Sequence, residues 1–275
     1  MRMAEDRSGA GVRSVQLAID VLEAVAFSDE ELGVTQLVDR LNVTKGSVHR
    51  NLHTLVERGY LTQNPATTRY AIGPKSRLLA RFASDADLVQ LAEGPMRELR
   101  DAFGHTVVLS AMTPRCALVL VTRTSTSPIE IGVRAGSELS FHVSAPGKVL
   151  RAFAPRPVQE RILAQPLKSF TVKTIVDRER IEDALVDIMK RGYASEPEEV
   201  LLGINAVAAP IFDDHDSCIA SLAIVGSIQF LPEKPKPPEV AALKDTSQQI
   251  SRRLGHARGL GGPVVKFRST RPKTG

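Results

Sequence analysis

The stretch from Gly33 to Arg58 constrains the fold most, because it predicts two short amphipathic helices joined by a tight turn. Thr35 is the expected N-cap of the first helix, and Asn42 interrupts its apolar pattern. Thr44 is the expected N-cap of the second helix, which ends at Gly59. The apolar residues recur at helical spacing, so one side of each helix is committed to a core: Leu37, Val38 and Leu41, then Val48, Leu52, Leu55 and Val56.

The opposite side of the second helix predicts contact with DNA, beginning at Thr44. It presents hydrogen-bond donors, one glycine that allows close approach, and no acid: Lys45, Gly46, Ser47, His49, Arg50 and His53. Such a face is often only a solvated surface, and the histidines are the weaker candidates. The surrounding charge favours binding to a phosphate backbone, because the segment from position 40 to 81 contains eight Lys or Arg and only one acid, Glu57. Lys45 and Arg50 are the expected base contacts, and Ser47 is the expected phosphate contact.

A preceding helix and a following hairpin complete the expected DNA-binding domain, residues 12–73. Ser14 is the expected N-cap of a helix to about Phe27. Its predicted buried face consists of Val15, Ala18, Ile19, Leu22 and Val25. Residues 60–73, YLTQNPATTRYAIG, predict two strands around an Asn64-Pro65 turn. Three helices and a hairpin indicate a winged helix-turn-helix with Arg69 on the wing, although the hairpin could instead only cover the core.

The charge is divided along the 275 residues, which suffice for about two domains. Formal net charge is +5, yet the last thirty residues alone contribute +7 without an acid. Basic ends and an acidic middle imply that one part of the chain meets a polyanion. Cys116 and Cys218 have no partner at metal-ligand spacing, which indicates buried thiols in a reducing cytosol. The absence of a long apolar run or a signal peptide predicts a soluble, cytoplasmic protein without membrane contact.

The second half predicts an α+β domain around an antiparallel sheet. A linker is expected over residues 74–92, with helices over 74–83 and 87–103 that end or kink at Gly94-Pro95. The expected effector domain covers residues 93–256, and the basic tail 257–275 is expected to be disordered. Strands are predicted at 106–112, 116–123, 128–134, 204–212 and 218–226, and helices at 145–153, 158–163, 178–191 and 238–254.

The assembled motifs resemble the IclR family of bacterial transcriptional regulators over about residues 12–255. The N-terminal signs are VQLAIDVLEAV, VTKGSVHRNLHTLVERGYL and the RYAIG that closes the wing. The later signs are GSELSFHVSAPGKVLRAF at 136–153, RGYASEPEEVLLGINAVAAPIFD at 191–213, and ASLAIVG at 220–226. The resemblance implies a winged-helix domain, a linker helix and a GAF-like effector-binding domain. It also implies a homodimer or tetramer that binds a palindromic operator and regulates, for example represses, a nearby catabolic operon.

The resemblance also implies where a small metabolite binds. Matching the family's motifs places these residues around the pocket: Pro146, Gly147, Glu196, Ala206, Ala223 and Val225. Glu196 stands where the family has aspartate, and Pro146 stands inside the GK motif. Ala206, Ala223 and Val225 stand where some relatives carry hydroxyls or thiols.

The chemistry of these residues predicts an organic acid as effector. Ser144 could cap the helix that begins at Ala145, and a free amide of Gly147 beside Lys148 would favour an anionic group. The side chains of the two alanines and Val225 offer no donors, so the remainder of the pocket favours an apolar or aromatic part. The alternative is that this segment is only a well-capped helix, with Lys148 paired to an acid.

Other chemistries are less well supported. A P-loop would require glycine at His142 and a hydroxyl at Val149, and no paired nucleophile and base appears, so an enzyme is not expected. Acids at 196, 198 and 199 indicate the start of a helix, and those at 213, 214 and 216 indicate a hairpin tip, so no metal or cofactor is predicted. Two alternatives to a sequence-specific regulator are a nucleoid-type protein that binds DNA through its basic tail and an enzyme with an appended basic domain.

Overall fold

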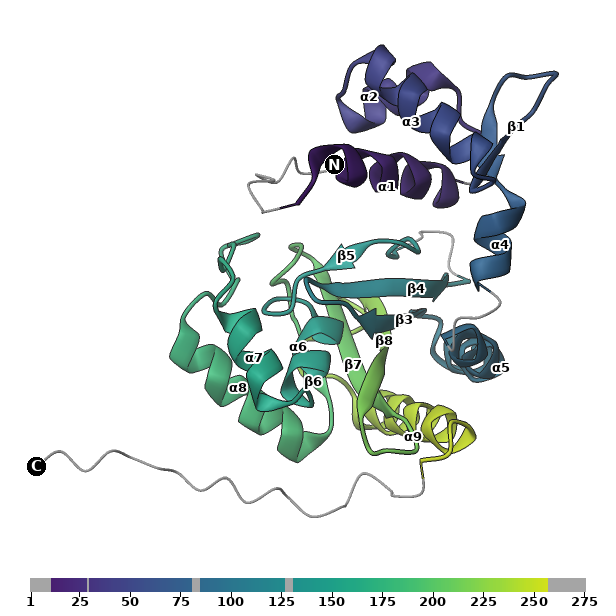
Figure 1. Cartoon of the computed structure of the whole chain (residues 1–275). Coiled ribbons are helices and arrows are strands. Elements are labelled where there is room, and N and C mark those ends of the chain that lie inside the picture. Colours follow the sequence, from purple (N-terminus) through teal and green to yellow (C-terminus); the bar gives the residue numbers. More distant parts are fainter. Residues whose placement is uncertain (1–10, 29, 81–84, 127–130, 257–275) are drawn as a thin grey trace, which may run out of the picture. The chain divides into compact units, whose positions relative to one another are not determined.

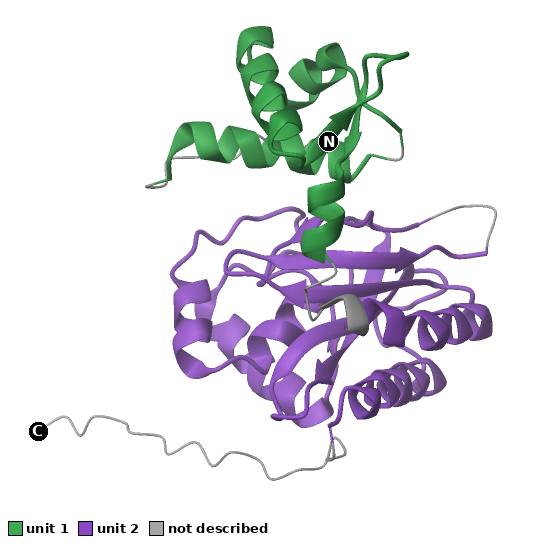
Figure 2. Cartoon of the chain, turned by 45° about the vertical axis from the view of Figure 1, so that its right-hand side comes forward, with its two compact units in different colours: residues 1–86 green, residues 87–275 purple. Residues whose placement is uncertain are grey.

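The computed structural model describes residues 11–28, 30–80, 85–126 and 131–256, with the side chains of 85–87 outside the description. The chain forms two compact units, residues 1–86 and 87–275 (Figure 2). No helix among the described residues combines the length and the apolar character that a membrane crossing requires. The expected disorder of the tail 257–275 lies outside the described residues.

The first unit is a winged helix-turn-helix, as predicted. It contains α1 (Arg13–Ala26), α2 (Val34–Leu41), α3 (Lys45–Glu57), β1 (Leu61–Gln63), β2 (Tyr70–Ile72) and α4 (Pro74–Ala80) (Figure 1). Thr44 caps α3 through the amide of Ser47, as expected, and Asn42 takes the left-handed conformation between the two helices. The expected caps at Thr35 and Ser14 are wrong, because Gly33 and Val12 occupy these positions.

The buried face of α1 matches the predicted one only in part, because Val25 is buried as expected while other predicted members are not. Val21, Ala24 and Val25 are buried, whereas Val15 and Ile19 are 54% and 48% exposed. The sequence offers two apolar stripes on this helix, and helical period alone does not distinguish them. The packing of α1 against α2, α3 and β2 selects the stripe that meets the core.

Most of α5 (Asp85–Phe103) belongs to the second unit, and this helix continues through Gly94-Pro95. The predicted end of the helix at Gly94-Pro95 is therefore wrong, and the alternative of a kink there stays a prediction. Proline removes one backbone hydrogen bond from a helix, but Leu88, Ala92, Met96 and Leu99 lie on one buried face and hold the helix against the sheet. The expected linker, residues 74–92, ends inside α5, which extends to Phe103. The boundary between the linker and the effector domain stays a prediction.

A six-stranded antiparallel sheet forms the centre of the second unit, in the order β5-β4-β3-β8-β7-β6. Its strands are β3 (Thr106–Met112), β4 (Ala117–Arg123), β5 (Glu138–Leu139), β6 (Ala194–Ser195), β7 (Ile204–Phe212) and β8 (Cys218–Ser227). Residues 131–134 do not form a strand, and the strand predicted at 128–134 is wrong over these positions. Residues 128–130 lie outside the described residues. The hydroxyls of Thr106 and Thr122 instead donate to the carbonyls of Ile131 and Val133, which holds this segment without a backbone ladder.

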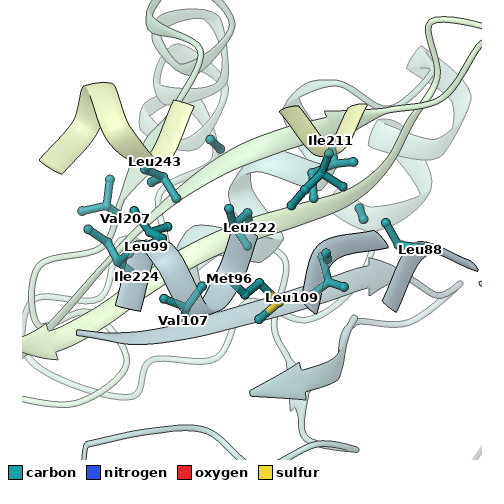
Figure 3. Close-up of a cluster of buried hydrophobic side chains, with 14 of the residues drawn as sticks. Leu88, Met96, Leu99, Val107, Leu109, Val207, Ile211, Leu222, Ile224 and Leu243 are labelled. Carbon is teal, nitrogen blue, oxygen red and sulfur yellow. The ribbon is translucent and has the colours of Figure 1, made fainter. Parts of the chain in front are cut away.

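Helices cover both faces of the sheet. One face packs on α5 and α9 (Pro237–Arg253) around a cluster that includes Met96, Leu109, Leu222 and Leu243 (Figure 3). The other face meets α6 (Ala145–Ala152) and α8 (Arg178–Arg191), while α7 (Arg156–Leu163) packs on α6. The alternation along β7 and β8 thus serves two cores, as expected for strands buried on both sides.

Candidate functional site

The first two turns of α3 present the predicted DNA-contacting set on one surface. Thr44, Lys45, Gly46, His49 and Arg50 are exposed, while Val48 and Leu52 face the core. Lys45 and Arg50 form no ion pair with a residue of the described ranges, so both charges remain available for contact with DNA. A Cβ atom at Gly46 would meet nothing within 4 Å, so the glycine leaves open space beside the backbone. The half-buried Ser47 shares a 2.9 Å hydrogen bond with the hydroxyl of Thr44.

The wing is fixed by an acid that sequence patterns did not reveal. Glu31 accepts hydrogen bonds from the Asn64 amide at 3.1 Å and from the Thr67 hydroxyl at 3.0 Å. Arg69 is exposed and donates one hydrogen bond, 3.3 Å long, to the Glu31 carbonyl. Glu31 therefore positions the turn and one guanidinium nitrogen of Arg69, whose other nitrogens retain donors for a phosphate.

The N-terminus of α6 is closed by the protein's own groups. Ser144 caps the helix by accepting from the Gly147 amide at 3.0 Å, so the predicted free amide is wrong. The Ala145 amide donates to Glu196 at 2.6 Å, and Pro146 has no amide hydrogen. Lys148 forms a buried ion pair with Glu199, as the alternative interpretation expected.

Glu196 is the most perturbed acid in this region. Burial raises its pKa to about 8, against the opposing effects of Lys148 and of the hydrogen bond from Ala145. The raised pKa favours the protonated carboxyl near neutral pH, and a protonated carboxyl can donate a hydrogen bond. The predicted helix start around residues 196–199 is wrong, because β6 ends at Ser195 and a turn follows.

Gly147 is required by packing within the protein. A Cβ there would lie 2.7 Å from Cα of Phe141 and 2.7 Å from Oγ of Ser144, and closer still to the carbonyl oxygen of Ser140. Real Cβ atoms do not approach so closely, so the loop and the helix can pack in this way only around glycine. The GK segment thus docks α6 on the preceding loop.

The structure brings the apolar members of the predicted effector set together. Ala206 faces Val225 across β7 and β8, and Ala223 lies in the same buried cluster as Ala145. Pro146 and Gly147 are buried in the first turn of α6 above this face. Sequence reasoning missed the other apolar members of the cluster, although strand alternation could have indicated two of them: Val108 and Val119, with Ile131, Val133 and Leu139 packed alongside.

Two further charged features lie outside this cluster. β7 and β8 pair antiparallel on either side of residues 213–217, which confirms the predicted hairpin tip. At this tip, one carboxylate oxygen each of Asp213 and Asp214 and one ring nitrogen of His215 lie within 4.8 Å of one another. Arg151 in α6 is fully buried, and its three guanidinium nitrogens lack hydrogen-bond partners among the described residues. Burial lowers its pKa to about 10, while Glu182 acts in the opposite direction.

The fold of the first unit and the basic face of α3 are those of a helix-turn-helix DNA-binding protein. The family model of the IclR helix-turn-helix domain matches residues 14–65. The family model of the bacterial transcriptional regulator IclR C-terminal domain matches residues 80–252. The HTH-type transcriptional regulator BhcR of Paracoccus denitrificans is 31% identical over 225 residues, 81% of this chain and 80% of BhcR. The glycerol operon regulatory protein of Streptomyces coelicolor is 30% identical over 254 residues, 90% of this chain and 98% of the relative.

Solved structures have the same fold. An IclR transcriptional regulator from Alicyclobacillus acidocaldarius matches with a TM-score of 0.70 at 25% identity, covering 88% of this chain and 98% of the other. An IclR homologue from Microbacterium hydrocarbonoxydans, complexed with 4-hydroxybenzoate, matches with a TM-score of 0.74 at 22% identity and the same coverage. The chain belongs to the IclR family of bacterial transcriptional regulators, which bind DNA through this helix-turn-helix.

Proposed function

We propose that the chain reads a palindromic operator through Lys45 and Arg50, with Ser47 and Arg69 on phosphates. The unpaired, exposed side chains on the first turns of α3 are the observation that carries this proposal. Thr44, Gly46 and His49 complete the contact surface. Two such helices in a symmetric dimer would meet half-sites about 34 Å apart, one turn of DNA.

Binding to the chain's own promoter fragment tests the operator surface. Arg50→Ala is expected to weaken operator binding by about 1 to 3 kcal/mol and to relax sequence preference. Arg58→Ala is the matched control, because it removes the same charge from the exposed C-cap of the same helix. Equal losses in both variants would refute base reading by Arg50. A nucleoid-type protein would bind random DNA as tightly as the promoter at every salt concentration.

We infer that the DNA-binding protein is at least a dimer. Val12, which precedes α1, and Val15 and Ile19 on α1 are exposed on the stripe that the core does not use. Leu78 and Leu79 are exposed on α4. Apolar side chains grouped in this way indicate a protein interface. Sedimentation of the purified chain tests this: Ile19→Asp should shift it towards monomer, whereas a monomeric wild-type chain would exclude the proposal.

The effector is proposed to be an organic acid with an apolar or aromatic part. The support is Glu196, whose pKa is raised by burial beside the α6 N-terminus, together with the buried apolar cluster that includes Ala206, Ala223 and Val225. A protonated Glu196 can donate a hydrogen bond to a ligand carboxylate. Pro146 and Gly147 lie in the adjoining first turn of α6. The 4-hydroxybenzoate bound by the Microbacterium homologue is an acid of this class.

A thermal-shift panel at constant pH distinguishes effector classes. Aromatic acids should raise the melting temperature, while small polyhydroxy acids and the corresponding neutral amides should not. Ala206→Asp, which places a charge in the buried apolar cluster, should abolish the shift. Stabilisation by small polar acids alone would overturn the proposed class.

A further inference from the structure

A groove of about 320 Å³ lies between α5 and α9, and its lining residue Leu99 also belongs to the core cluster shown in Figure 3. Its floor is apolar, with Leu99, Ala102, Phe103 and Ala242. Its lining contains two acids, Glu98 on α5 and Asp245 on α9, and no base. Neither carboxylate has an ion-pair partner within the described ranges. An apolar floor with two unpaired acids suits a peptide that carries basic and apolar residues in alternation.

The chain itself contains such a segment. Residues 264–268 read VVKFR, within a tail, 257–275, that has five basic residues and no acid. In an extended conformation, Val265 and Phe267 lie on one side and Lys266 and Arg268 on the other. The apolar side can meet the floor while the long basic side chains reach the carboxylates.

The length of the tail allows the segment to reach the groove. The last described residue, His256, is held 3.2 Å from Asp216 and stacks on Phe212, which fixes where the tail begins. From there Val264 can reach roughly 26 Å, at about 3.3 Å per residue. Gln249 and Ala242, which mark the two ends of the α9 side of the groove, lie about 8 and 18 Å back along the helix from Leu254.

We propose that the α5–α9 groove is a docking site for the chain's own C-terminal segment 264–268. Phe267 occupies the apolar floor, and Lys266 and Arg268 pair with Asp245 and Glu98. Docking in this way neutralises basic charge that would otherwise be available to DNA. The proposal is independent of the operator surface and of the effector, because it uses neither α3 nor α6.

Disulfide trapping in the full chain tests the proposal. Gln249→Cys in the groove is combined with Ser269→Cys beside the segment, and the control pairs Ser269→Cys with Ala241→Cys, an exposed position on α9 outside the groove. The native thiols give little background, because Cys116 is buried and burial raises the pKa of Cys218 to about 12. The groove pair should close roughly tenfold faster than the control pair, through its higher effective concentration.

Charge reversal separates docking from random encounter. Asp245→Lys should slow trapping roughly threefold, and adding Lys266→Glu should restore the rate. The proposal is overturned by equal rates in groove and control pairs, by no effect of charge reversal, or by trapping only between two chains. It is also overturned if trapping stays at the control rate while removal of 257–275 reduces the salt dependence of random-DNA binding, because DNA is then the tail's partner.

Discussion

Glu196→Gln offers the sharpest test of the electrostatics around α6. In the folded chain, burial raises the pKa of Glu196 from 4.5 to about 8. Below pH 4.5 the carboxyl is protonated in both folded and unfolded states, so it contributes no difference. Between pH 4.5 and 8 the folded chain retains a proton that the unfolded chain has released. Its contribution to the free energy of unfolding therefore falls by up to about 1.4 kcal/mol per pH unit.

Glutamine removes this titration and keeps a carbonyl that can accept the Ala145 hydrogen bond. Between pH 5.5 and 7.5, wild type should lose up to about 3 kcal/mol relative to Glu196→Gln. Urea unfolding followed by circular dichroism at several pH values measures both slopes. Glu160→Gln is the control, because this exposed acid forms a surface ion pair with Arg156. Parallel curves for wild type and Glu196→Gln would refute the reasoning, and would mean that Ala145 and Lys148 hold Glu196 as an anion.

Two further predictions concern the same unit. Gly147→Ala should lower the free energy of unfolding by about 1 to 3 kcal/mol through overpacking. Its control, Gly94→Ala, lies in open space on a helix and should raise the free energy of unfolding by up to about 1 kcal/mol. Equal melting temperatures of the two variants would show that the loop beside Gly147 moves to accommodate the methyl group. Arg151→Met should raise the free energy of unfolding by about 1 to 4 kcal/mol, because it removes a buried charge that has no hydrogen-bond partner among the described residues. A large loss of stability in urea unfolding would reveal a partner for the guanidinium.

The DNA-binding unit could be predicted largely from sequence, because its signals are local. Thr44 and its helix, the apolar residues of α3 and the Asn64 turn follow rules that act within a few residues. The side of α1 that is buried could not be predicted in this way. Val15 and Ile19 have the same period as Val21 and Val25, and only the neighbouring helices select between them.

In the second unit, the sequence determined most of the strands and helices and the apolar character of Ala206, Ala223 and Val225. The tertiary structure decided the chemistry above them. Glu196 is fifty-one positions from Ala145, yet it closes the α6 N-terminus and changes its own proton affinity by being buried there. Local sequence rules act within a few residues, whereas desolvation depends on which distant segments cover a group, so the site acquires its electrostatics only when the sheet and α6 are packed together.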